Sequence, residues 1–398
     1  MSPSAGTAKR VVPVLALAAL SLLLTLDYAS VQPNRIMPGT GVALIAAIGT
    51  AWSGLLAGGL LLLAALAALP LRRAASAIGR ARLMGLVGTV LLCCLPFTLS
   101  TFIQRHISPD SPYARVGLGP GFWCLLFFLA LIMIEVLRRA RAGATLRLAA
   151  SAAILAAWAW CLRSGSLDTL SLIREYHNRT GQFRGALEQH LALSLGSVGI
   201  SLIIGFFLAI HVTHRPKWQR PVFALVNFIQ TVPSLALFGL LIAPLSALSA
   251  HFATLQALGI RGIGWAPAAL ALIAYSLLPM VRNTYVALTE VPADVVDAGR
   301  GMGMSDGQLF RQVKLPLALP VIIEGVRVTT IQAIGLTAVA ALIGAGGFGD
   351  FIFQGLGQAA MDLVLLGALP TIALAVIADA LLSWLARQVT PPSMRDLS

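Results

Sequence analysis

The chain has 398 residues, of which 58% are hydrophobic and only 11% are charged. A soluble protein of this length has too little polar surface to cover so many apolar side chains, so the composition excludes that class and indicates a membrane protein. The net charge of +13 would also suit a nucleic-acid-binding protein, but the basic residues are scattered among short segments between apolar runs. Membrane orientation explains this pattern better, and we expect no nucleic-acid partner.

Ten apolar runs are long enough to cross roughly 30 Å of hydrocarbon as helices. The first follows Lys9 and Arg10 and has the length of a signal peptide, but Asp27 and Tyr28 stand where a cleavage site needs small residues, which favours a retained span. The sequence therefore predicts an all-α polytopic membrane protein with about ten transmembrane helices. The runs cover residues 11–27, 41–69, 83–103, 118–137, 146–162, 191–213, 221–243, 263–283, 318–343 and 361–387.

The distribution of Lys and Arg predicts the topology. With the N-terminus in the cytoplasm, 19 of the 28 basic residues fall on the cytoplasmic side and 8 on the opposite side, which leaves Arg327 inside a span. This bias satisfies the positive-inside rule. We therefore expect both termini, and the polar segment 290–316, to be cytoplasmic.

A polar segment at residues 163–190 carries both signs of charge and separates five predicted spans from the other five. On the predicted topology it is an extracytoplasmic linker. Residues 1–162 then form an N-terminal membrane extension of about five helices. Residues 191–390 form a second domain, which holds every patterned motif, including the cytoplasmic loop 290–316.

The familiar motifs of enzyme chemistry are absent from the chain. It has no GxxxxGK[ST] phosphate loop, and neither HExxH, CxxC nor GxSxG occurs. The four cysteines lie in apolar runs at spacings that suit no zinc site, so small buried hydrophobes are the expected role. We expect a chain that is not an enzyme and that binds no metal or cofactor itself.

Charged residues within the spans are few. Glu324 and Arg327 are spaced i, i+3 and are expected to pair on one helix face, which is a simpler explanation than a proton relay. Asp379 is harder to dismiss, and a functional role for it stays open. A transporter with so little buried charge and no nucleotide site must receive its energy from another subunit.

The loop at residues 290–316 has the signals of two short helices. Pro292 suits the start of the first, and the glycines that follow residue 298 weaken and end it. Ser305 and Gln308 have the spacing of a capping box for the second, with Met304 and Leu309 as its hydrophobic staple. Leu315-Pro316 is expected to stop the second helix where the next span begins. An ordinary interfacial loop resting on headgroups explains these signals about equally well.

The same segment resembles the EAA signature of importer-type ABC permeases. That signature runs Glu-Ala-Ala, three residues, Gly, nine residues, a branched apolar residue, any residue and Leu-Pro. The spacing is kept in full, with Asp297 in place of Glu and Gly299 in place of the second Ala. The resemblance implies that this loop forms coupling helices in a groove of a separate ATPase subunit, with Leu309 and Phe310 as apolar contacts. The expected coupling residues are Asp297, Ala298, Gly299, Gly303, Ser305, Leu309, Phe310, Leu315 and Pro316.

Three further segments resemble the permease subunits of osmoprotectant importers: residues 230–241, 275–288 and 343–356. The resemblance covers about residues 185–390 and implies a type I ABC importer permease core, made of the last five spans. Residues 1–162 resemble a larger subgroup with an N-terminal membrane extension, by length and hydropathy alone.

The resemblance also implies the partners. These are cytoplasmic ATPase subunits that hold the ATP-Mg, an extracytoplasmic substrate-binding protein, and a second permease chain, the same or homologous. All would assemble in the lipid bilayer of a bacterial cytoplasmic (inner) membrane.

A quaternary ammonium group is usually held by aromatic faces through cation–π contact. Four aromatic residues are therefore candidates for the translocation path, although a lipid-facing or packing role explains any single one better. Two glycines could form a gate or simply a tight turn. The candidates are Phe238, Tyr275, Phe348, Phe351, Gly346 and Gly347.

Three alternatives remain beside an importer for a compatible solute such as glycine betaine. The EAA spacing alone would also suit a permease for an amino acid or an aliphatic sulfonate. An ion-coupled secondary transporter or channel is disfavoured by the scarcity of buried charge. A structural membrane scaffold would have no use for a capped cytoplasmic segment.

Overall fold

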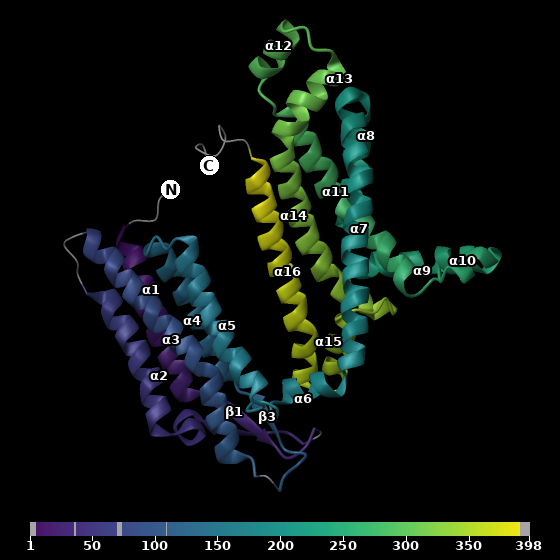
Figure 1. Cartoon of the computed structure of the whole chain (residues 1–398). Helices are drawn as coiled ribbons and strands as arrows, with labels where there is room; N and C mark the ends of the chain where they lie inside the picture. Colours follow the sequence, from purple (N-terminus) through teal and green to yellow (C-terminus); the bar gives the residue numbers. More distant parts are fainter. Residues whose placement is uncertain (1–4, 36, 70–73, 109, 391–398) are drawn as a thin grey trace. The chain divides into compact units, whose positions relative to one another are not determined.

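The computed structural model describes residues 5–35, 37–69, 74–108 and 110–390, and the chain divides into two compact units, Met1–Asn178 and Arg179–Ser398. The division falls within the segment 163–190 of the sequence analysis, which itself contains a short helix and the first turns of a long one (Figure 1). Arg72, Arg73 and Arg395, which the topology prediction counts as cytoplasmic, lie outside the described residues.

The first unit is a helical bundle with a small sheet at one end of it. The sheet joins three short strands in the order β2-β1-β3, and both pairings are antiparallel. The sequence pattern predicts no strand here, because these segments are shorter than the apolar runs beside them. The elements are α1 (Ala5–Thr25), β1 (Asp27–Gln32), β2 (Thr40–Ala43), α2 (Leu44–Ala68), α3 (Ala74–His106), β3 (Arg115–Leu118), α4 (Pro120–Arg139), α5 (Ala144–Arg163) and α6 (Ser171–Asn178).

Polar contacts tie the sheet of the first unit to its helices. The hydroxyls of Tyr28 on β1 and Thr98 on α3 lie 2.5 Å apart, and both residues are fully buried. Glu175 on α6 is also buried and accepts a hydrogen bond of 2.6 Å from Arg115 on β3, with Arg35 at 3.1 Å. A buried carboxylate is stable only when it is paired, so this ion pair fixes α6 against the sheet.

The second unit holds the long helices of the predicted permease core. Helix α11 packs against α7 and α14, and α14 packs against α16. The helices are α7 (Thr180–His214), η1 (Pro216–Trp218), α8 (Gln219–Thr231), α9 (Ser234–His251), α10 (Ala253–Ala257), α11 (Trp265–Thr289), α12 (Ala293–Gly301), α13 (Asp306–Leu309), the π-helical turn η2 (Phe310–Lys314), α14 (Leu315–Ala340), η3 (Ala341–Ile343), α15 (Gly349–Gly357) and α16 (Met361–Val389).

The helical membrane-protein class is confirmed. Among the described residues, 9 helices are long and apolar enough to cross a membrane, and residues 11–25 form a shorter apolar helix. The prediction of one span over residues 221–243 is wrong, because α8 ends at Thr231 and α9 begins at Ser234. Pro233 lacks an N–H group and forces Val232 into an extended conformation, which interrupts the helix.

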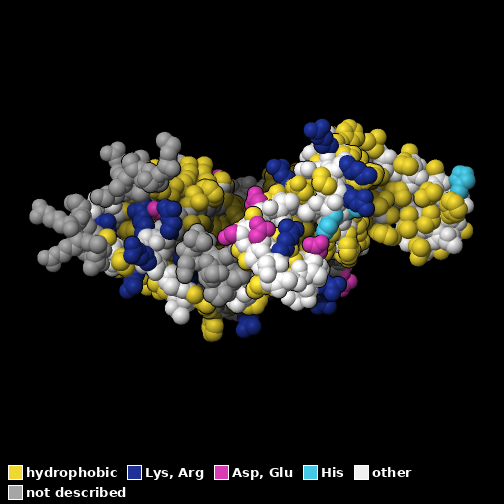
Figure 2. Space-filling model, turned by 90° about the horizontal axis from the view of Figure 1, so that it is seen from above, with side chains coloured by type: hydrophobic (Ala, Val, Ile, Leu, Met, Phe, Trp, Pro, Cys, Tyr) yellow, Lys and Arg dark blue, Asp and Glu magenta, His cyan; other side chains and the backbone are white. Residues whose placement is uncertain are grey.

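Helices α9 and α10 form an arm that extends away from α7 and α11 within the second unit (Figure 1). Phe238 anchors the start of α9 in a buried cluster with residues of α7 and α11. Beyond it, apolar side chains lie on the surface, such as Leu240 at 65% and Leu258 at 67% exposure. Figure 2 shows this apolar arm beside the end of the unit that carries α12 and α13, where charged side chains gather.

Arg327 joins two long helices of the second unit. Its Nε donates to Asp379 on α16 at 2.6 Å, and its Nη1 donates to Glu324 on α14. The expected pairing of Glu324 with Arg327 is confirmed, and Asp379 completes the group. Because charge within a span is costly unless it is paired, this group links α14 to α16.

We expect Arg327→Met to lower the amount of folded chain in the membrane, since it leaves two carboxylates unpaired within the spans. The exchange Arg327→Asp with Asp379→Arg should restore much of that amount. Quantitative immunoblotting of membranes and the Tm of the purified protein would measure both effects. Arg282→Met is the matched control, because Arg282 lies on α11, is exposed and has no ion-pair partner among the described residues. A normal level for Arg327→Met would contradict the assignment.

Candidate functional site

Helix α12 ends in a tightly defined turn. The N–H of Gly303 donates to the carbonyl of Arg300 at 2.9 Å, and that of Met304 donates to the carbonyl of Gly299 at 3.2 Å. These two bonds form a Schellman motif, whose left-handed position is held by Gly303 at φ +84°. The glycines therefore end the helix in one specific geometry.

The capping box of the second short helix is confirmed. The side chain of Ser305 accepts from the N–H of Gln308 at 3.4 Å, and the side chain of Gln308 accepts from the N–H of Ser305 at 2.9 Å. Each side chain satisfies a backbone donor that the helix start leaves free. The segment 290–316 is therefore locally ordered, as the sequence predicts.

Gly299 brings α12 and α13 into direct contact. A Cβ atom at this position would lie 2.7 Å from Cδ1 of Leu309 and 3.4 Å from Sδ of Met304. The first distance is shorter than real Cβ contacts, so only glycine allows this packing without a shift. A larger residue at this position would make the side chain of Leu309 shift, besides raising the helix propensity of α12.

The structure revises the expected roles of Leu309 and Phe310. Leu309 is only 2% exposed, and Phe310 is half-buried against a cluster that includes Leu288 and Ile322. Leu309 packs against α12 at Gly299, and Phe310 packs against the ends of α11 and α14. The exposed residues lie on α12, on its C-terminal turn and at the start of α13, and they include Asp297, Ala298, Ser305 and Met302, the last at 72% exposure.

The prediction that Leu315-Pro316 stops a helix is wrong. The chain stays helical from Asp306 to Ile343, and Pro316 lies in the first turn of α14. Proline removes one N–H donor, and the turn just before it, η2, has the wider π-helical form. The short helix and the long span are therefore continuous, with the π-helical turn η2 between them.

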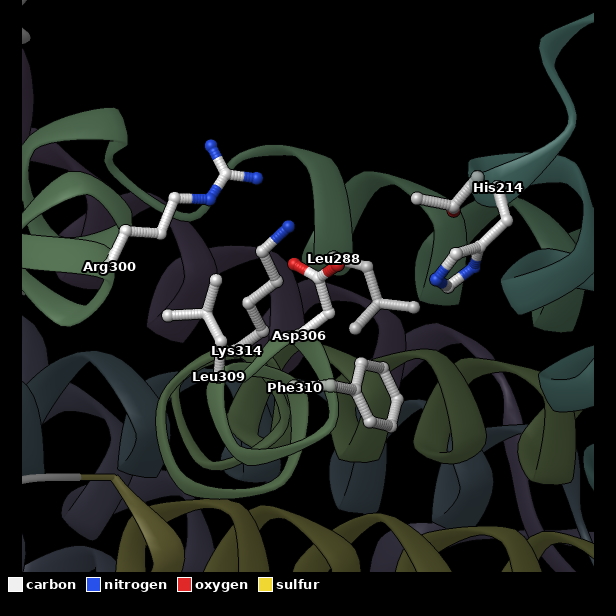
Figure 3. A pocket seen from close by; sticks show the side chains of 8 residues that line it. His214, Leu288, Arg300, Asp306, Leu309, Phe310 and Lys314 are labelled. Carbon is white, nitrogen blue, oxygen red and sulfur yellow. The ribbon is translucent and has the colours of Figure 1, made fainter. Parts of the chain in front are cut away.

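A cavity of about 300 Å³ lies beneath this segment. Figure 3 shows Arg300, Asp306 and Lys314 on one side of it, with His214 across from them and Phe310 below. The cavity therefore separates α12 and α13 from the end of α7.

The aromatic candidates for the path are mostly packing residues in this structure. Phe238 is fully buried, and Tyr275 is 8% exposed. The hydroxyl of Tyr275 donates to the carbonyl of Val232, and Gln230 donates to the carbonyl of Tyr275 at 2.7 Å. Tyr275 therefore stabilises the break between α8 and α9.

The glycine candidates lie in the loop between η3 and α15, residues 344–348. Gly346 and Gly347 have φ values of +80° and +86°, so this loop needs glycine at both positions. The N–H of Gly347 donates to Oε1 of Gln189 at 3.1 Å, and that of Phe348 donates to Nδ1 of His190 at 3.4 Å. Two side chains of α7 thus hold the loop by its backbone.

His190 is fully buried, and its two ring nitrogens have different partners. Since Nδ1 accepts from Phe348, the proton of the neutral ring resides on Nε2, which donates to the carbonyl of Ile334 at 3.1 Å. The rings of Phe348 and Phe183 lie 5.1 Å apart, and Phe183 also contacts Phe351. The contacts of His190, Phe183 and Phe348 therefore join the starts of α7 and α15 to the end of α14.

Gln189 and His190 are not among the candidates that the sequence motifs single out. A signal for their role is present in the sequence, since both are polar and stand directly before an apolar run of α7. Polar side chains at the start of a span need hydrogen-bond partners. What the sequence did not reveal is that their partners lie 158 residues further along the chain.

Comparison with known proteins places this architecture in a family. Residues 201–391 match the model of the binding-protein-dependent transport system inner membrane component, and residues 8–173 match the N-terminal domain of ABC transporter permease YehY. The osmoprotectant import permease protein OsmW of Salmonella typhimurium is 42% identical over 52% of this chain and 91% of its own length. A glycine betaine/carnitine/choline transport system permease protein, OpuCB of Bacillus subtilis, is 36% identical over 52% of this chain and 89% of its own.

Among solved structures, the MetNI methionine ABC transporter in an inward-facing conformation matches 53% of this chain and 98% of its own chain, with a TM-score of 0.47 and 25% sequence identity. The identity to the curated relatives and the two family matches agree with the resemblance drawn from the motifs. The chain belongs to the binding-protein-dependent transport family, as a membrane permease subunit of an ABC importer that carries a YehY-type N-terminal domain.

Proposed function

We propose that this chain forms the translocation path for a quaternary-ammonium osmoprotectant such as glycine betaine. The single observation that supports this substrate class is sequence identity to permeases named for osmoprotectants, glycine betaine, carnitine or choline. The identity is 36–42% over about nine tenths of the length of those permeases. The motifs at residues 230–241, 275–288 and 343–356 support the same class.

The segment 290–316 is proposed to receive the work of ATP hydrolysis from separate cytoplasmic ATPase subunits. Its support is local: a Schellman turn, a capping box and a π-turn make it a rigid body joined to α14. The exposed surface of α12 offers Val295 and Met302 as apolar contacts, with the weak ion pair of Asp297 and Arg300 at 3.9 Å beside them. In this proposal ATP and Mg²⁺ bind to the ATPase subunits.

The rest of the assembly follows from the family. An extracytoplasmic binding protein would deliver the substrate, and a second permease chain, the same or homologous, would complete the path. The proposed location is a bacterial inner membrane, with both termini in the cytoplasm. Reporter fusions after residues 5 and 390 would test the orientation, and an active periplasmic reporter at either position would contradict it.

Uptake measurements test the substrate class. Cells that express this permease with its neighbouring transport genes, in a host without other betaine transporters, are expected to accumulate labelled glycine betaine. Labelled methionine and histidine serve as controls and should not accumulate above the level of the empty host. Accumulation of methionine or histidine without glycine betaine would replace the proposal with an amino-acid importer.

A further inference from the structure

A second cavity lies at the opposite end of the second unit from α12 and α13. Its volume is about 670 Å³, within the range of small-molecule binding sites. Helix α7, the loop before α11 and the loop after η3 form its wall, and the N–H of Gly264 donates to the carbonyl of Ile343 at 2.8 Å to join the two loops. None of the six path candidates from the sequence analysis lines it.

Two side chains at this cavity have the chemistry to recognise a zwitterion. Arg261 lines the cavity and has no ion-pair or hydrogen-bond partner among the described residues. A guanidinium group binds a carboxylate through two parallel hydrogen bonds. Trp265 also lines the cavity with 47% of its surface exposed, and an indole face is the strongest aromatic partner of a quaternary ammonium.

The wall of the cavity adds neutral hydrogen-bonding groups. Gln189 lines it and uses its Oε1 to hold the N–H of Gly347. Ser197 lines it too, and its buried hydroxyl has no hydrogen-bond partner in the described part of the chain, whereas Ser194 and Ser201 on the same helix donate to backbone carbonyls at 2.6 and 2.7 Å.

We propose that this cavity is a transit site for the substrate within the permease. Arg261 binds the carboxylate of a zwitterion such as glycine betaine, and Trp265 covers its quaternary ammonium group. The contact of Gln189 with Gly347 couples occupancy of the cavity to the glycine loop, residues 344–348. The assignment rests on the proposed function, because it takes the substrate class from there.

Uptake of labelled glycine betaine by the complete transporter, with its ATPase subunits and binding protein in proteoliposomes, tests the site. Arg261→Gln should lower the rate at saturating binding protein about tenfold, and Arg261→Lys should recover part of it because one charged donor remains. Trp265→Leu should lower the rate about fivefold or more, whereas Trp265→Phe keeps an aromatic face and should retain most of it. Basal ATP hydrolysis is measured in parallel for all four variants, and its retention shows that each complex has assembled.

Arg184→Gln and Trp218→Leu are the matched controls, because both residues are exposed and neither lines the cavity. Variants at Arg261 and Trp265 that transport as well as these controls overturn the site. Loss of basal ATP hydrolysis together with uptake, without rescue by Arg261→Lys or Trp265→Phe, assigns the residues to folding and also overturns it. Failure of the unmodified transporter to import glycine betaine overturns the proposed function itself, which distinguishes the two failures.

Discussion

Replacing Gly303 with valine is expected to abolish substrate-stimulated ATP hydrolysis while the chain remains inserted in the membrane. Gly303 has a φ of +84°, and a residue with a side chain in this left-handed region costs about 1–2 kcal/mol, more when it is β-branched. No atom lies within 4 Å of a Cβ placed there, so the effect comes from the backbone and not from a clash. The Schellman turn would open and move α12 relative to α13.

The matched control for this change is Gly301→Ala. Gly301 is the last residue of α12, its φ is not positive, and a Cβ there would also meet no atom within 4 Å. Alanine should therefore be tolerated and should stabilise the helix by up to about 1 kcal/mol. ATP hydrolysis by the assembled transporter in proteoliposomes, with and without loaded binding protein, measures both variants. Normal stimulation of ATP hydrolysis by the loaded binding protein in the Gly303 variant would contradict the proposed coupling role of residues 290–316.

Gly346→Ala is expected to stop transport by disrupting the loop between η3 and α15. A Cβ at this position would lie 2.1 Å from Oε1 of Gln189, and φ is +80°. Gln189 would have to move, and Gly347 would lose its hydrogen bond to that oxygen. Strain of this kind costs on the order of 1–3 kcal/mol, and every 1.4 kcal/mol is about a factor of ten in an equilibrium.

Glycine betaine uptake measures this effect, with the amount of chain in the membrane determined in parallel. Gly335→Ala is the control, because Gly335 lies within α14 and has no atom within 4 Å of a Cβ placed there. The control should transport normally, and Gly346→Ala should retain less than about a tenth of the uptake at an unchanged chain level. Equal uptake in the two variants would show that the loop tolerates a side chain and has no gating function.

The local structure of residues 290–316 was largely predictable because its signals are local. The caps at Ser305 and Gln308 join residues three apart, and the turn at Gly303 depends on the conformation of one residue. The signal for the break between α8 and α9 was equally local, since it is Pro233 itself. The break does not interrupt the apolar run, because both helices beside it are apolar, so hydropathy alone did not reveal it. The role of Leu309 was not predictable, since an apolar side chain at that position suits a partner's groove as well as the unit's own core.

The sequence by itself determined the class of protein, the approximate spans, the capped segment and the family motifs, because composition, periodicity and caps act within a few residues of the chain. The tertiary structure decided which side chains are available. It buried Phe238, Phe348 and Leu309, joined Gln189 to a loop 158 residues away, and left Arg261 and Trp265 beside a cavity. Contacts between distant segments depend on how whole helices pack, and no local pattern specifies that.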